Sequence, residues 1–252
     1  MTKIMINIVM WAILLTSPVC ISAFDASYDA FQTANNLARL ADYPKAITNY
    51  RNMAAMGQES GSLYWNWAQA ALAQGRSGEA LWAYLRAMEL EPNDRAIARE
   101  IERLREAINL DSAELTPDPL AVLARNTRRF RFDILSSLLL TISVLTHLIA
   151  RLRKTVILAR VSGVTFMVGA LLTTLIFVGA LADPTGVVVR RGASLVDAAS
   201  QSADTLGALR EGEVVPILQE SGSYLLVEDA SGARGWTHIE DVRRLDRPLK
   251  IP

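Results

Sequence analysis

The side chains that most often carry catalysis or hold metals are sparse in this chain. Among its 252 residues there are one cysteine, Cys20, and two histidines, His147 and His238, all far apart. We find no metal-ligand spacing, no nucleophile motif and no phosphate-binding loop. Acidic residues such as Glu100 and Glu106 follow the spacing of a helix surface. The sequence therefore predicts a protein that is not an enzyme and that uses no metal or cofactor.

Residues suited to binding are better represented, and a first group lies in the N-terminal half. An aromatic residue beside side-chain amides suits the capture of an extended or helical peptide. The candidates that share this character are Trp65, Asn66, Gln69, Asn35 and Phe31. The alternative is that Trp65 is covered by the preceding helix and that the amides are only solvated.

A second group of candidates lies near the C-terminus. Tyr224 and Trp236 are the aromatic anchors expected for a peptide-binding or cell-wall-binding groove. The alternative is that both are half-buried structural residues. His238 has no second histidine or cysteine near it in sequence, so we expect a surface or hydrogen-bonded role rather than a metal ligand.

The first group requires a helical scaffold, which we expect over residues 24–110. Large and small residues follow a helix-pair repeat of about 34 residues, the tetratricopeptide pattern, and a more degenerate copy lies one period earlier. The pattern positions are Tyr64, Trp67, Ala68, Gly75, Ala80, Tyr84, Ala87 and Pro92, preceded by Ala30, Ala34, Ala46 and Tyr50. Asp42 and Pro44 should open a helix. Residues 94–108 should form a capping helix with one apolar stripe.

The second group requires strands, which we expect over residues 184–246. Short apolar runs separated by turn residues predict an all-β barrel of five strands, at 187–189, 195–196, 214–218, 224–227 and 235–236. Alternation should place Val215 and Ile217 opposite Leu225 and Val227. The region is similar to bacterial SH3 domains, although their usual Arg-Ser-Gly-Pro turn is replaced by residues 197–200.

Two apolar runs between these regions, 134–150 and 161–182, predict a transmembrane hairpin, because crossing a bilayer takes about 20 residues. A short basic loop, 151–160, should lie in the cytoplasm. Small residues should allow close helix packing, with Ala159 and Gly163 facing a helix that carries Ser136 and Ser143. His147, the one ionisable residue within a span, should be neutral and hydrogen-bonded.

Residues 1–23 resemble an export signal, with Lys3, an apolar stretch and small residues up to Ala23. Export followed by two spans predicts that both soluble domains lie on the periplasmic side of the bacterial inner membrane. Residues 111–133 should form a linker with a basic juxtamembrane segment. Its arginines form either an interfacial helix or a solvated flank: Arg125, Arg128, Arg129 and Arg131.

Taken in order, these segments resemble BatE, the tetratricopeptide member of the Bacteroides aerotolerance operon proteins. The likeness includes Tyr43-Pro44-Lys45-Ala46 and Leu63-Tyr64-Trp65-Asn66, the two spans and the SH3-like tail. The resemblance implies partners of two kinds, membrane-anchored von Willebrand A-domain proteins and, indirectly, a MoxR-type ATPase. It also implies a role in an oxidative or envelope stress complex.

The function expected from these features is a non-enzymatic, multidomain membrane scaffold that binds partner proteins through both soluble domains. The alternative is a cell-wall module that binds peptidoglycan and recruits a wall enzyme. Nucleic acid is not an expected partner, because 26 basic side chains are balanced by 26 acidic ones.

Overall fold

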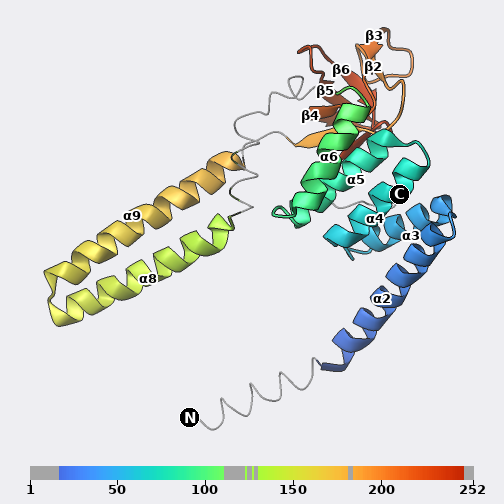
Figure 1. The fold of residues 1–252 in the computed structure, drawn as a ribbon. Helices are drawn as coiled ribbons and strands as arrows, with labels where there is room; N and C mark the ends of the chain where they lie inside the picture. Colours follow the sequence, from blue (N-terminus) through green and yellow to red (C-terminus); the bar gives the residue numbers. More distant parts are fainter. Residues whose placement is uncertain (1–16, 111–122, 124–126, 128–129, 181–183, 247–252) are drawn as a thin grey trace.

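The computed structural model describes residues 17–110, 123, 127, 130–180 and 184–246 (Figure 1). A helical N-terminal part, an apolar helical hairpin and an antiparallel all-β C-terminal part follow one another, which confirms the predicted layout at this level. Of the predicted signal segment, residues 1–16 lie outside the described residues, and residues 17–23 begin the first described helix. The linker at 111–122 and Arg125, Arg128 and Arg129 also lie outside them.

The N-terminal part consists of helices that pack in chain order. They are α2 (Ser17–Arg39), α3 (Tyr43–Ala55), α4 (Gly61–Ala73), α5 (Ser77–Leu90) and α6 (Arg95–Ala107). Large aromatic side chains from α3, α4 and α5 fill the space between these helices, and each is fully buried: Tyr50, Tyr64, Trp67, Trp82 and Tyr84. Small alanines beside them let the helices approach closely.

The helix boundaries follow from capping residues. Asp42 accepts a hydrogen bond from the Lys45 backbone N–H, as predicted, and Pro44 occupies the first turn of α3. The Ser60 hydroxyl accepts from the Leu63 N–H at 3.1 Å and so caps α4. After α4 the chain turns at Gly75, whose φ of +70° favours glycine.

The C-terminal part is a seven-stranded antiparallel sheet in the order β3-β2-β6-β5-β4-β1-β7. The strands are β1 (Thr185–Val188), β2 (Ser194–Val196), β3 (Thr205–Ala208), β4 (Val214–Ser221), β5 (Tyr224–Glu228), β6 (Arg234–His238) and β7 (Val242–Arg244). The prediction of five strands was therefore wrong. It missed β3, which is exposed along its whole length, and β7, which contains two arginines, because neither shows apolar alternation.

The inner face of the sheet carries the β core. Val215 and Ile217 on β4 and Leu225 and Val227 on β5 are all buried, as the alternation predicted. Ile217 lies opposite Val227 in the strand register. The chain reverses at Gly222 and Gly232, whose φ values of +57° and +84° favour glycine.

Two helices, α8 (Phe132–Arg153) and α9 (Val156–Gly179), are long and apolar enough to cross a membrane. They lie side by side as an antiparallel hairpin that projects from the rest of the chain (Figure 1). Both helices extend into the basic segment expected between them, so the predicted loop at 151–160 is mostly helical. Only Lys154 and Thr155 connect the helices.

A seam of small residues joins α8 to α9. Ser136, Ser143 and Ala150 are buried at intervals of seven residues, and Ser162 and Gly169 face them from α9. The Ser143 hydroxyl donates to the Ser162 carbonyl at 2.9 Å. The serines were correctly predicted, but Ala159 and Gly163 are exposed, because residue 163 lies about 100° around the helix from Ser162. His147 is also exposed, on the outer surface of the hairpin.

The seam generates a prediction for the full chain in detergent. A Cβ atom at Gly169 would lie 3.0 Å from the Leu140 side chain, whereas one at Gly163 would meet nothing within 4 Å. We expect Gly169→Leu to destabilise the hairpin by about 1–3 kcal/mol through overpacking, and the matched Gly163→Leu variant to change it little. Thermal unfolding measured by circular dichroism tests this, and equal effects of the two substitutions would contradict it.

Candidate functional site

The helical and β parts are joined by an interface centred on α5, and this interface sets their relative position. Trp82 Nε1 donates to the Arg244 carbonyl at 2.8 Å, and Arg86 Nη1 donates to the Leu245 carbonyl at 2.6 Å. Val187 and Leu245 of the β part are buried in the apolar core of the helices. The helical and β parts therefore share a core and form one unit.

A buried ion pair lies at the centre of the interface. Glu79 on α5 is 5% exposed, and its Oε1 lies 2.9 Å from Arg243 Nη1 on β7. Trp67 Nε1 donates to the same oxygen at 3.1 Å. The Arg243 guanidinium also lies over the Trp82 ring, 4.7 Å from its centroid. The charge pair is therefore enclosed by two indole rings and has polar partners within the interface.

Burial and neighbouring charges shift the pKa values of this pair in opposite directions. Burial by itself would raise the pKa of Glu79, but the charges of Arg243 and Arg51 and the Trp67 hydrogen bond hold that pKa below its ordinary value. Burial lowers the pKa of Arg243, and Glu79 opposes that change. The interface is therefore stabilised when Glu79 is ionised.

The first predicted group of binding residues lies on α2 and α4, and hydrogen bonds to neighbouring side chains fix its position. The Asn35 side-chain oxygen accepts from the Tyr50 hydroxyl at 2.7 Å and from the Asn66 amide at 2.9 Å. Phe31 is half-buried and lies near Tyr50, with 6.4 Å between ring centroids. Burial raises the pKa of Tyr50 to about 12, so its hydroxyl stays protonated as a donor.

Trp65 and Gln69 continue this group along α4, and we call the five predicted residues on α2 and α4 the row. Trp65 is half-buried and meets the Tyr84 ring edge-on, with 5.3 Å between centroids. The exposed Gln69 donates its amide to the Tyr84 hydroxyl. The structure thus brings the five predicted residues into one row and fixes their amides through Tyr50 and Tyr84. Whether the row binds a peptide stays a prediction.

The second predicted group lies on the face of the sheet opposite the β core. Trp236 pairs across the strands with Leu226, and Tyr224 pairs with His238. The Tyr224 and His238 rings meet edge-on, 5.5 Å apart. All four side chains are half-buried, so Tyr224 and Trp236 share a mixed aromatic and aliphatic surface. Among the described residues no group of three potential ligands could hold a metal ion.

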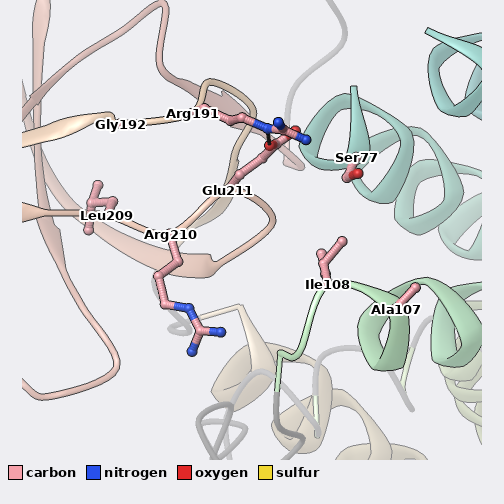
Figure 2. Close-up of a pocket in the computed structure, with 8 residues that line it drawn as sticks. All are labelled: Ser77, Ala107, Ile108, Arg191, Gly192, Leu209, Arg210 and Glu211. Atoms are coloured by element: carbon pink, nitrogen blue, oxygen red, sulfur yellow. Dashed lines mark hydrogen bonds and ion pairs between the residues drawn. The ribbon is translucent and has the colours of Figure 1, made fainter. Parts of the chain in front are cut away.

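A cleft of about 490 Å³ that the sequence did not predict lies between the helical and β parts. Figure 2 shows Ser77 and Ile108 of the helical part on one side, and Arg210 and Glu211 of the β part on the other. The Glu211 carboxylate accepts from the Gly78 backbone N–H at 2.9 Å, near the start of α5. No sequence pattern signals such a cleft, because its two sides lie far apart in the chain.

Comparisons of the chain with models of known protein families, with curated proteins and with solved structures found no match. The likeness to BatE proteins therefore stays a prediction.

The ion pair at the interface predicts a pH dependence. The lowered pKa of Glu79 means that its contribution to stability is complete above the ordinary value of 4.5 and is lost as the pH falls through the lower folded value. We expect Glu79→Gln to lower the Tm of the full chain in detergent at pH 7, because buried Arg243 loses its counter-charge. The difference from the native protein should shrink as the pH falls below the ordinary pKa of 4.5 and through the lower folded value.

Thermal unfolding followed by tryptophan fluorescence measures this difference. The matched control is Glu228→Gln, which breaks an ion pair with Arg234 that is mostly exposed. We expect little change in Tm from this control. A Tm difference for Glu79→Gln that stays constant over the pH range would show that Glu79 does not stabilise the interface through its charge.

Proposed function

We propose that this protein is a non-enzymatic membrane scaffold that presents two recognition surfaces to partner proteins. The observation that carries the proposal is the interface between the soluble parts, where Glu79 pairs with Arg243 and Trp82 donates to the Arg244 carbonyl. This interface holds the row at Trp65 and Asn66 at a fixed position relative to the sheet face at Tyr224 and Trp236.

A fixed arrangement favours assembly for a physical reason. Two sites on one rigid unit do not lose further freedom relative to each other when a partner binds both of them. The candidate membrane helices α8 and α9 would add confinement to one membrane plane, which raises the local concentration of membrane-bound partners.

The same interface supports the proposal that both soluble parts lie on one side of the membrane. Contacts between α5 and the β part can form only if the chain returns across the bilayer between them, and an antiparallel pair of spans achieves this. The export-like N-terminus favours the periplasmic side. The sequence resemblance favours a tetratricopeptide helical domain, an SH3-like β domain and partners of the von Willebrand A-domain and MoxR classes.

Substitutions in the row test the scaffold role. We expect Trp65→Ala and Asn66→Ala, in full-length protein purified in detergent, to reduce co-purifying membrane proteins several-fold. These substitutions remove the half-buried aromatic ring and one half-buried amide that the proposal offers to a peptide. Tm should fall only modestly for Asn66→Ala, which removes a hydrogen bond worth about 1 kcal/mol. It should fall further for Trp65→Ala, which removes the ring contact with Tyr84, so Asn66→Ala is the variant that separates binding from stability.

Leu40→Ala, which truncates a 78% exposed side chain outside the row, is the control. Quantitative mass spectrometry of the purified samples compares all three variants with the native protein. An unchanged set of partners in both row variants would remove the row from the proposal. Retention of the native protein on isolated peptidoglycan, lost in Trp236→Ala, would instead favour the cell-wall alternative.

A further inference from the structure

A second cleft, of about 450 Å³, lies beside the first between the helical and β parts, and its lining is rich in arginine. Five arginines from both parts line it: Arg51, Arg76, Arg190, Arg191 and Arg243. Three glutamates also line it: Glu79, Glu211 and Glu240. Clefts of this size are typical of small-molecule sites.

The carboxylates of the cleft do not fully satisfy its guanidinium groups. Glu79 pairs closely with Arg243, but its contacts to Arg51 and Arg76 are long, at 3.5 and 3.4 Å. Each guanidinium has five N–H donors, whereas a carboxylate has two oxygens. Arg51 and Arg76 therefore keep donors that are free to bind an additional anion.

The remaining acidic groups are already paired. Glu211 binds Arg191 and the Gly78 N–H, and Asp241 behind the cleft binds Arg190 at 3.1 Å. When Asp241 is counted with the three lining glutamates, five arginines face four carboxylates, which leaves one positive charge in excess.

The positive groups also lie nearer to solvent than the main carboxylate. The side chains of Arg51, Arg76 and Arg190 are 43%, 50% and 63% exposed, whereas that of Glu79 is 7% exposed. An incoming ligand therefore meets guanidinium groups before it meets Glu79. Glu240, which is 67% exposed and lies 3.9 Å from Arg190, is the acidic exception at the mouth of the cleft.

We propose that this cleft binds a small anionic molecule through a phosphate or carboxylate group. Planar guanidinium groups from two parts of the fold can bind the oxygens of such a group with paired, charge-assisted hydrogen bonds. Arg76 and Arg51 contact the ligand from the helical part, and Arg190 contacts it from the β part. The site is separate from the row and the sheet face, so it does not depend on the scaffold proposal.

Isothermal titration calorimetry of the full chain in a non-ionic detergent tests the site, with inorganic pyrophosphate and citrate as probes at low salt. We expect at least one probe to bind with one-to-one stoichiometry. A preference for pyrophosphate or for citrate identifies the ligand group as phosphate or carboxylate. Absence of binding by both probes would overturn the proposal.

Substitutions that remove a positive or a negative charge from the cleft test where the probe binds. Arg76→Gln and Arg190→Gln should each weaken binding about tenfold, because each removes a charge-assisted contact. Glu240→Gln should tighten binding about threefold, because it removes a repelling charge at the mouth of the cleft. The matched control, Arg95→Gln, removes an exposed arginine from the start of α6, outside the cleft, and should leave binding unchanged.

The gain in affinity separates a binding site from a folding defect, since a damaged fold would not bind more tightly. Thermal unfolding of each variant, measured in parallel, confirms that the fold is retained. Equal affinities in Arg76→Gln, Arg190→Gln and the native protein would overturn the proposal. Weaker or unchanged binding in Glu240→Gln would also overturn it.

Discussion

The arrangement of the soluble part depends on one buried contact, the ion pair of Glu79 with Arg243. The Glu79 side chain is 7% exposed and that of Arg243 is 20% exposed, so removing either partner leaves a poorly solvated charge without its counter-charge. Trp67 donates a hydrogen bond to Glu79, and the Arg243 guanidinium lies over the Trp82 ring. These contacts also fix the orientation of both charged side chains. Separating the helical and β parts would break this pair together with the hydrogen bonds from Trp82 and Arg86 to the Arg244 and Leu245 carbonyls. The two parts are therefore expected to move and unfold together.

This contact explains how a chain of alternating segments forms a single soluble unit. Residues 17–110 and 184–246 build the unit, and the hairpin of α8 and α9 is inserted between them. The role of α5 is central, because one side of it packs into the helical core while Trp82, Arg86 and Glu79 meet β7 and the residues that follow it. An insertion of this kind is tolerated when the ends of the inserted segment lie close together, and an antiparallel hairpin meets that requirement.

The three candidate surfaces differ in how they are built. The row on α2 and α4 is held by hydrogen bonds to buried tyrosines, and the face at Trp236 is held by the strand register. The arginine cleft differs from both, because residues of α3, the α4–α5 turn and the β part line it together. It exists only in the joined unit, so its shape and charge depend on the contact between Glu79 and Arg243.

The sequence by itself determined the features that repeat over short distances. Helix periodicity identified the helical part, and the length of two apolar runs identified the hairpin. Capping chemistry located the start of α3, and alternation identified the buried side of β4 and β5. Local patterns could not identify β3 and β7, which lack alternation, or the facing of Ser162 rather than Gly163 toward α8. The relative position of the two soluble parts was decided only by the tertiary structure. Glu79 and Arg243 are 164 residues apart, and their meeting depends on the shapes of two folded surfaces, which no local spacing of residues records.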